Sequence, residues 1–165
     1  MITQTDKQVL SDSARAEIDK WLAQYPPEWK QAAVIAALKV VQDENGGWLT
    51  EPLMDAVAKY LGMPPIAVYE VATFYTMFNL KQVGRHVINI CTNVSCMLCG
   101  SEQIIKHMEN RLGITLGETT PDGRFTLKEA ECLAACAGAP MFYIGDTFHE
   151  NLTPQKIDKI LDGLE

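Results

Sequence analysis

Two short cysteine pairs constrain the fold of this chain more than any other feature of its sequence. Cys91 and Cys96 enclose four residues, Cys132 and Cys136 enclose three, and 35 residues lie between the pairs. Thiolates are strong ligands of soft metals, and four of them at one point can hold an iron–sulfur cluster or a zinc ion. A fold that uses all four must bring two distant loops together, so we expect the functional site in the C-terminal half.

The overall composition is that of a soluble globular protein. The chain has 165 residues, of which 47% are apolar and 21% charged, enough for one domain or two small ones. The formal net charge of -7 argues against sequence-independent nucleic-acid binding, which requires Lys and Arg to displace counterions. No apolar run approaches the ~20 residues that a membrane-spanning helix needs.

The N-terminal residues and the cysteine count favour a reducing compartment. Residues 1–17 contain no apolar core of a signal peptide, and Asp6 and Asp12 are unlike an acid-poor transit peptide. We therefore expect a cytoplasmic protein or the mature form of an organellar one. Five cysteines are an odd number, which a disulfide framework leaves unexplained, so metal binding or redox chemistry is favoured.

Apolar residues at helical spacing predict a small helical bundle over residues 11–79. Ser11 and Thr50 are expected helix caps, and proline pairs and the 45–47 turn separate four helices. The three tryptophans, Trp21, Trp29 and Trp48, are expected packing anchors. The predicted apolar faces are Ile18, Trp21, Leu22 and Tyr25; Val34, Leu38 and Val41; Leu53, Met54, Val57 and Leu61; and Val68, Val71, Ala72, Tyr75 and Phe78.

The second half alternates between strand and helix patterns. A short apolar strand over 86–90 runs into Cys91, and a helix capped by Ser101 follows Cys96, which falls in a loop. Strands are expected at 124–127, 141–144 and 147–150, and a final helix begins at Thr153-Pro154. This order suits a thioredoxin-like α/β layer. If the strands before the two cysteine pairs are neighbours, both pairs emerge at one end of the sheet.

A [2Fe–2S] cluster matches the two pairs because each iron takes two thiolates, and backbone N–H groups must offset the negative charge of the site. Zinc also accepts four thiolates, and the spacing does not exclude it. A third possibility is a reactive dithiol formed by Cys96 and Cys99, with Pro140 beside it. A fourth is the plant-type ferredoxin spacing of Cys91, Cys96 and Cys99, which leaves one later cysteine unused.

Other chemistry finds little support in the sequence. His86, His107 and His149 are not spaced as partners of a cysteine pair, and we expect His107 on the solvent side of its helix. No glycine-rich phosphate loop is present, so the chain shows no site for a dinucleotide or a nucleoside triphosphate.

At these residues the chain resembles the thioredoxin-like [2Fe–2S] subunit of respiratory complex I (NADH:quinone oxidoreductase), known as the E subunit. The resemblance covers nearly the whole chain beyond residue 13. The matching stretches are 32–49, 68–78, 83–86, 91–96, 117–123, 131–141 and 152–154.

The resemblance implies an α+β protein: a helical bundle over residues 1–82 that docks a partner, then a thioredoxin-like [2Fe–2S] ferredoxin domain over 83–165. It implies that Cys91, Cys96, Cys132 and Cys136 ligate the cluster and that Cys99 does not. Between the last two cysteines, the stretch Leu133-Ala134-Ala135 has alanine at a position where the family is associated with glycine, which departs from the pattern.

The resemblance also implies a role in electron transfer, as part of an enzyme but with no complete active site in this chain. The cluster would exchange an electron with FMN in a partner flavoprotein subunit that also binds NADH. Further complex I subunits are expected partners, with no nucleic acid and no membrane insertion, in the peripheral arm on the cytoplasmic or matrix side of the inner membrane. Equivalent subunits of NAD-dependent formate dehydrogenases and NAD(P)-linked hydrogenases are the alternative, but the match over the helical half favours complex I.

Overall fold

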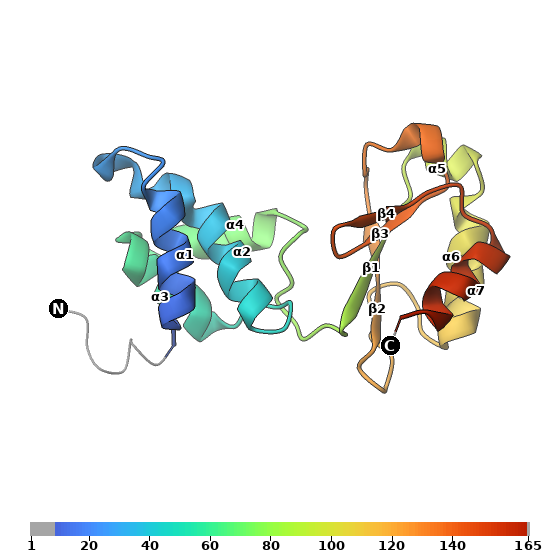
Figure 1. Ribbon diagram of the computed structural model, residues 1–165, viewed down its shortest axis with the longest axis horizontal. Coiled ribbons are helices and arrows are strands. Elements are labelled where there is room, and N and C mark those ends of the chain that lie inside the picture. The colour runs from blue at the N-terminus through green and yellow to red at the C-terminus, as the bar shows by residue number, and fades with distance from the viewer. Residues whose placement is uncertain (1–8, 165) are drawn as a thin grey trace. The chain divides into compact units, whose positions relative to one another are not determined.

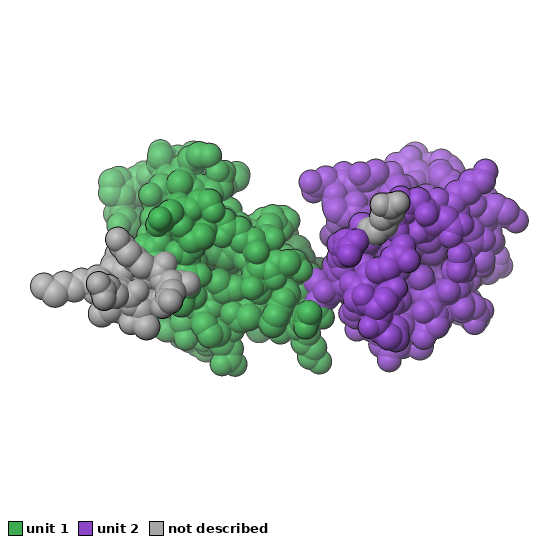
Figure 2. Space-filling model, turned by 60° about the horizontal axis from the view of Figure 1, so that its bottom comes forward, with its two compact units in different colours: residues 1–82 green, residues 83–165 purple. Residues whose placement is uncertain are grey.

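The computed structural model describes residues 9–164, so Asp6 lies outside the described residues. The chain divides into two compact units, residues 1–82 and 83–165, which Figures 1 and 2 distinguish. The described part of the first unit is helical, and the second unit contains a four-stranded sheet. Within the described residues, no helix combines the length and the apolar character needed to cross a membrane.

Local sequence signals define the helices of the first unit. The Ser11 hydroxyl accepts a hydrogen bond from the Ala14 N–H, and the Thr50 hydroxyl accepts one from the Leu53 N–H, so both predicted caps are confirmed. A 3-10 helix, η1, precedes the second helix and was not predicted. The helices are α1 (Asp12–Leu22), η1 (Pro27–Ala33), α2 (Val34–Glu44), α3 (Glu51–Leu61) and α4 (Pro65–Phe74).

The predicted apolar faces form the core of the first unit, except at aromatic residues such as Trp21 and Tyr25, which are 38% and 37% exposed. Ile18, Leu38 and Val57 are fully buried. Trp29, however, is 55% exposed, because it lies in η1 where the backbone departs from helical angles. The prediction that it is a packing anchor is therefore wrong. Helix α4 ends at Phe74, earlier than expected, and Tyr75 beyond it is partly exposed.

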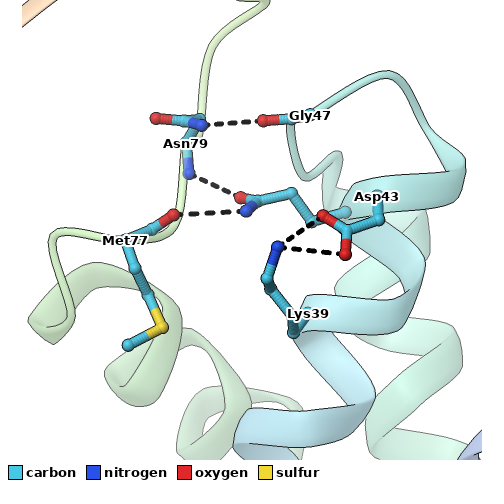
Figure 3. Close-up of polar contacts among 6 residues, drawn as sticks. Lys39, Asp43, Gly47, Met77 and Asn79 are labelled. Atoms are coloured by element: carbon cyan, nitrogen blue, oxygen red, sulfur yellow. Dashed lines mark hydrogen bonds and ion pairs between the residues drawn. The ribbon is translucent and has the colours of Figure 1, made fainter. Parts of the chain in front are cut away.

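A buried glutamine ties the segment after α4 to helix α2 (Figure 3). The Gln42 side chain donates a hydrogen bond to the Met77 carbonyl at 3.2 Å and accepts one from the Asn79 N–H at 2.7 Å. The Asn79 side-chain amide donates to the Gly47 carbonyl at 2.7 Å. Polar atoms can be buried at low cost only when they are bonded in this way, so Gln42 specifies the path of the chain that leaves the bundle.

Replacing Gln42 with Ala should lower the free energy of unfolding of the first unit by roughly 1–3 kcal/mol, because two buried hydrogen bonds are lost. The matched control is Lys39→Ala on the same helix, which removes an exposed ion pair with Asp43. That change should cost less than about 0.5 kcal/mol. Urea denaturation of both variants measures the difference, and equal losses would contradict the role given to Gln42.

The second unit contains one mixed sheet. Its strands are β1 (His86–Cys91), β2 (Phe125–Ala130), β3 (Phe142–Ile144) and β4 (Thr147–His149), in the order β2-β1-β3-β4. Strand β1 pairs parallel with β2 and antiparallel with β3. The predicted order of the strands and of the two longer helices is confirmed, and β2 extends farther toward the second cysteine pair than expected.

Helices α6 (Ser101–Leu112) and α7 (Pro154–Asp162) pack on the core that the strands provide (Figure 1). The buried members of this core include Ile104 and Met108 of α6, Ile157 and Leu161 of α7, and Ile88, Ile90, Leu127 and Phe142 of the sheet. His107 of α6 lies 2.9 Å from an oxygen of Asp158 in α7. The prediction that His107 lies on the solvent side of its helix is therefore wrong, since the side chain is half-buried and joins the two helices.

Two predictions about the segment after Cys91 are also wrong. Ser101 is buried inside the first turn of α6, and the cap position is Gly100 in a left-handed conformation with φ 93°. Cys96 lies in a short helix, α5 (Val94–Leu98), rather than in a loop. The Asn93 side chain accepts a hydrogen bond from the Val94 N–H at the start of α5, and this cap was a signal that the sequence contained.

Candidate metal centre

Parallel pairing of β1 with β2 brings the two cysteine pairs to the same edge of the sheet. Cys91 is the last residue of β1 and lies opposite Ala130, the last residue of β2. Cys132 follows two residues later. The Thr92 N–H donates to the Ala130 carbonyl at 3.1 Å, which continues the pairing into the loops. Both loops therefore leave the sheet side by side.

The first pair is buried. Cys91 is 4% exposed and Cys96 is 1% exposed, and both pack with Met141 and with the half-buried Leu133 and Ala135 of the second loop. Burial raises the pKa of the Cys96 thiol to about 11, and the hydrogen bond and charge of Cys91 contribute to this rise. The Met141 N–H acts in the opposite direction, because a hydrogen bond to sulfur stabilises the thiolate.

The second pair is exposed on a loop. The Ala134 N–H donates to the sulfur of Cys132 at 3.4 Å, and Cys136 begins a short 3-10 helix, η2 (Cys136–Gly138). The charge of Cys136 acts on Cys96, so the second loop lies near the first pair. The Ala139–Pro140 peptide bond that follows η2 is cis.

All five cysteines are free thiols. Within residues 9–164, no group of three or more His, Cys, Asp or Glu side chains has the arrangement of a metal site. The structure thus places Cys91 and Cys96 together and brings Cys136 within electrostatic range of them. The four-cysteine ligand set stays a prediction.

The donor set nevertheless fits an iron–sulfur cluster. The candidate ligands are sulfur atoms from two adjacent loops, and backbone N–H groups already point at two of them, at Cys96 and Cys132. Such N–H···S hydrogen bonds offset the negative charge that four thiolates bring to a cluster. Neither the Met141 N–H nor the Ala134 N–H was predicted, because both depend on loop conformation.

The geometry disfavours Cys96 as the nucleophile of a reactive dithiol with Cys99. A nucleophilic cysteine is accessible and has a lowered pKa. Cys96 has the opposite properties, since it is buried and its pKa is raised. Cys99 is exposed at the end of α5.

Comparisons with known proteins agree with the fold and with an iron–sulfur cofactor. The family model described as thioredoxin-like [2Fe-2S] ferredoxin matches residues 18–165. The E subunit of the NADH-quinone oxidoreductase of Rickettsia conorii is 50% identical over 144 residues, which cover 87% of this chain and 86% of that protein. The E 2 subunit of the Rhizobium meliloti NADH-quinone oxidoreductase is 47% identical over 149 residues, with 90% and 87% covered.

Two further proteins are similar to this chain, but the chain covers a smaller share of each of them. The mitochondrial NADH dehydrogenase [ubiquinone] flavoprotein 2 of Dictyostelium discoideum is 47% identical over 90% of this chain, which spans 60% of that protein. The structure of an NAD+-reducing [NiFe]-hydrogenase in the air-oxidised state aligns with a TM-score of 0.68 and 21% identity. That alignment covers 79% of this chain and 22% of the hydrogenase chain, and it shows the fold alone.

The chain therefore belongs to the thioredoxin-like [2Fe–2S] ferredoxin family, and over most of its length it is similar to the E subunit of NADH-quinone oxidoreductase. The resemblance and the fold class predicted from the sequence are confirmed, and so is the [2Fe–2S] cluster as the cofactor of the family.

Ala134 adopts a conformation that disfavours alanine. Its φ is 56°, in the left-handed region that costs an L-residue about 1–2 kcal/mol, whereas glycine enters it freely. This backbone conformation gives a physical reason for glycine at the position. The same turn directs the Ala134 N–H at the sulfur of Cys132.

Replacing Ala134 with Gly should raise the free energy of unfolding by up to about 1 kcal/mol, because relief of the left-handed strain exceeds the added chain entropy. The control is Ala137→Gly in η2, where no left-handed conformation is relieved. That change should be destabilising. Thermal unfolding of both variants tests this, and a loss of stability in Ala134→Gly would contradict the explanation.

Proposed function

We propose that this chain is the electron-transfer subunit of the NADH-oxidising module of respiratory complex I, and that Cys91, Cys96, Cys132 and Cys136 hold its one [2Fe–2S] cluster. The observation that carries the proposal is the 50% identity to the E subunit of an NADH-quinone oxidoreductase over 86% of that protein. The meeting of two cysteine loops at one edge of the sheet supports it. The likeness to the hydrogenase concerns the fold only and does not favour a second function.

When bound, the cluster supplies a centre that accepts and returns one electron. The chain's own residues provide a different environment for each of the two cysteine pairs. Cys91 and Cys96 lie in an apolar layer with Met141, which keeps water away from their sulfurs. Cys132 and Cys136 are exposed, so their side of the site is accessible to a partner. Backbone N–H groups at Ala134 and Met141 stabilise thiolate sulfur.

The partner is a flavoprotein subunit that binds FMN and NADH, and other subunits of the complex complete the assembly. The chain needs no complete active site of its own, since it carries electrons for its neighbour. It belongs to the peripheral arm of the complex, on the cytoplasmic side of the inner membrane or on the matrix side in an organelle. Nucleic acid is not a partner.

Residues 1–82 form the docking domain. All five cysteines lie beyond this range, so the first unit contributes none of the proposed ligands. It exposes large apolar side chains on and after α4: Ile66 is 64% exposed, Phe74 is 77% exposed and Met77 is 47% exposed. Apolar groups of this size in contact with water favour association with another protein.

Replacing Phe74 with Ser should weaken binding of the flavoprotein subunit by about 1–3 kcal/mol, because an exposed aromatic anchor is lost. The matched control is Phe148→Ser in the second unit, where the phenyl ring is 54% exposed. Affinity for the purified partner measures both effects. Equal losses, or none at Phe74, would argue against docking through the first unit.

Replacing Cys132 with Ser should abolish or strongly weaken cluster binding, whereas Cys99→Ser should leave it intact. The difference is expected because a serine hydroxyl is a poor substitute for a thiolate ligand of iron, and Cys99 is outside the proposed ligand set. Iron and acid-labile sulfide assays on the anaerobically purified full chain measure both variants.

Loss of the cluster in the Cys99 variant would overturn the ligand assignment. A colourless wild-type protein that reduces disulfides through Cys96 and Cys99 would instead identify a dithiol oxidoreductase. A colourless protein that contains zinc and is inert toward disulfides would identify a zinc-stabilised interaction module.

A further inference from the structure

The segment between β4 and α7 is held against the second cysteine loop. The Asn151 N–H donates to the Gly138 carbonyl at 2.6 Å, and the Leu152 N–H donates to the Pro140 carbonyl at 3.0 Å. We call residues 150–152 the strap. Its two hydrogen bonds fasten the loop two and four residues after Cys136.

The strap is itself anchored at both ends. Leu152 is buried in the core of the second unit, and Lys156 in the first turn of α7 donates to the Glu150 carbonyl. On the other side, His149 pairs with Phe142 in the β3–β4 ladder. Asn151 adopts a left-handed conformation with φ 49°, which non-glycine residues rarely adopt. The strap therefore has one defined path between the sheet and the helix.

The Glu150 side chain packs directly on Gly138. A Cβ atom at position 138 would lie 2.5 Å from the Cβ of Glu150 and 2.4 Å from its Cδ, far inside van der Waals contact. Gly138 is buried, although Cys136 two residues earlier is exposed. Glycine is therefore required at 138 because the strap lies so close, and not because of an unusual φ.

We propose that Glu150 is a positioning residue of the cluster site. Its side chain packs against Gly138 and thereby holds the η2 turn in one position. The position of this turn sets the direction in which the Cys136 thiolate leaves the loop. This inference rests on the proposed function, since it assigns Glu150 a role toward the four-cysteine site. An exposed thiol needs such external support, because the apolar layer that holds Cys91 and Cys96 does not enclose it.

Replacing Gly138 with Ala should cause the folded, anaerobically reconstituted full chain to release iron at least tenfold faster to a chelator than the wild type. The matched control is Gly163→Ala, where an added Cβ would meet its nearest atom at an ordinary 3.4 Å. That variant should release iron at the wild-type rate. Thermal unfolding, measured in parallel, separates loosening of the site from loss of the fold.

A second-site change tests the contact itself. Glu150→Gly alone removes the side chain that packs on Gly138, so this single variant should also release iron faster than the wild type. In the double variant Gly138→Ala/Glu150→Gly, the three atoms nearest to the new methyl group are gone and the methyl occupies part of the vacated space, so iron release should be slower than in either single variant. Glu150→Ala keeps the Cβ at 2.5 Å, so Gly138→Ala/Glu150→Ala should remain fast. Rescue by both double variants, or by neither, overturns the assignment of Glu150.

The outcomes also separate this inference from the proposed function. A wild-type chain that binds no iron or sulfide contradicts the proposed function and the role of Glu150 with it. A wild-type chain that holds the cluster, together with a Gly138→Ala variant that holds it equally well, contradicts the role of Glu150 alone.

Discussion

The parallel pairing of β1 with β2 is the interaction on which the candidate site depends. Six residue pairs, from His86 opposite Phe125 to Cys91 opposite Ala130, align the two strands in the same direction. The chain therefore leaves both strands at one edge, and both cysteine loops begin there. An antiparallel pairing would have sent the loops to opposite ends of the sheet, and no rearrangement of loops as short as these could have brought them together.

The two loops are supported in different ways, and this difference organises the site. Cys91 ends β1 and is held by the sheet, and the loop that follows turns into α5 and buries the Cys96 thiol among apolar side chains. The second loop stays exposed and depends on hydrogen bonds from the β4–α7 connection. Burial on one side and accessibility on the other suit a centre that must be shielded from water yet reach a partner.

The first unit contains a packed core and none of the proposed cysteine ligands. Its core is apolar, and one buried amide, Gln42, specifies how the chain leaves the bundle. Local patterns predicted its helices well because each cap, such as Ser11 or Thr50, bonds within its own turn. Such patterns failed at Trp29, where the backbone of η1 departs from helical angles, and in the second unit at His107, whose partner Asp158 lies far along the chain.

The sequence by itself determined the cysteine pairs, the order of the strands and the longer helices, and the family, since these follow from residue type and spacing along the chain. Only the tertiary structure decided that Cys96 is buried while Cys132 is exposed, that Ala134 is left-handed, and that Glu150 faces Gly138. Each of these depends on where distant segments meet. Spacing along a chain carries no information about such contacts until the sheet has formed.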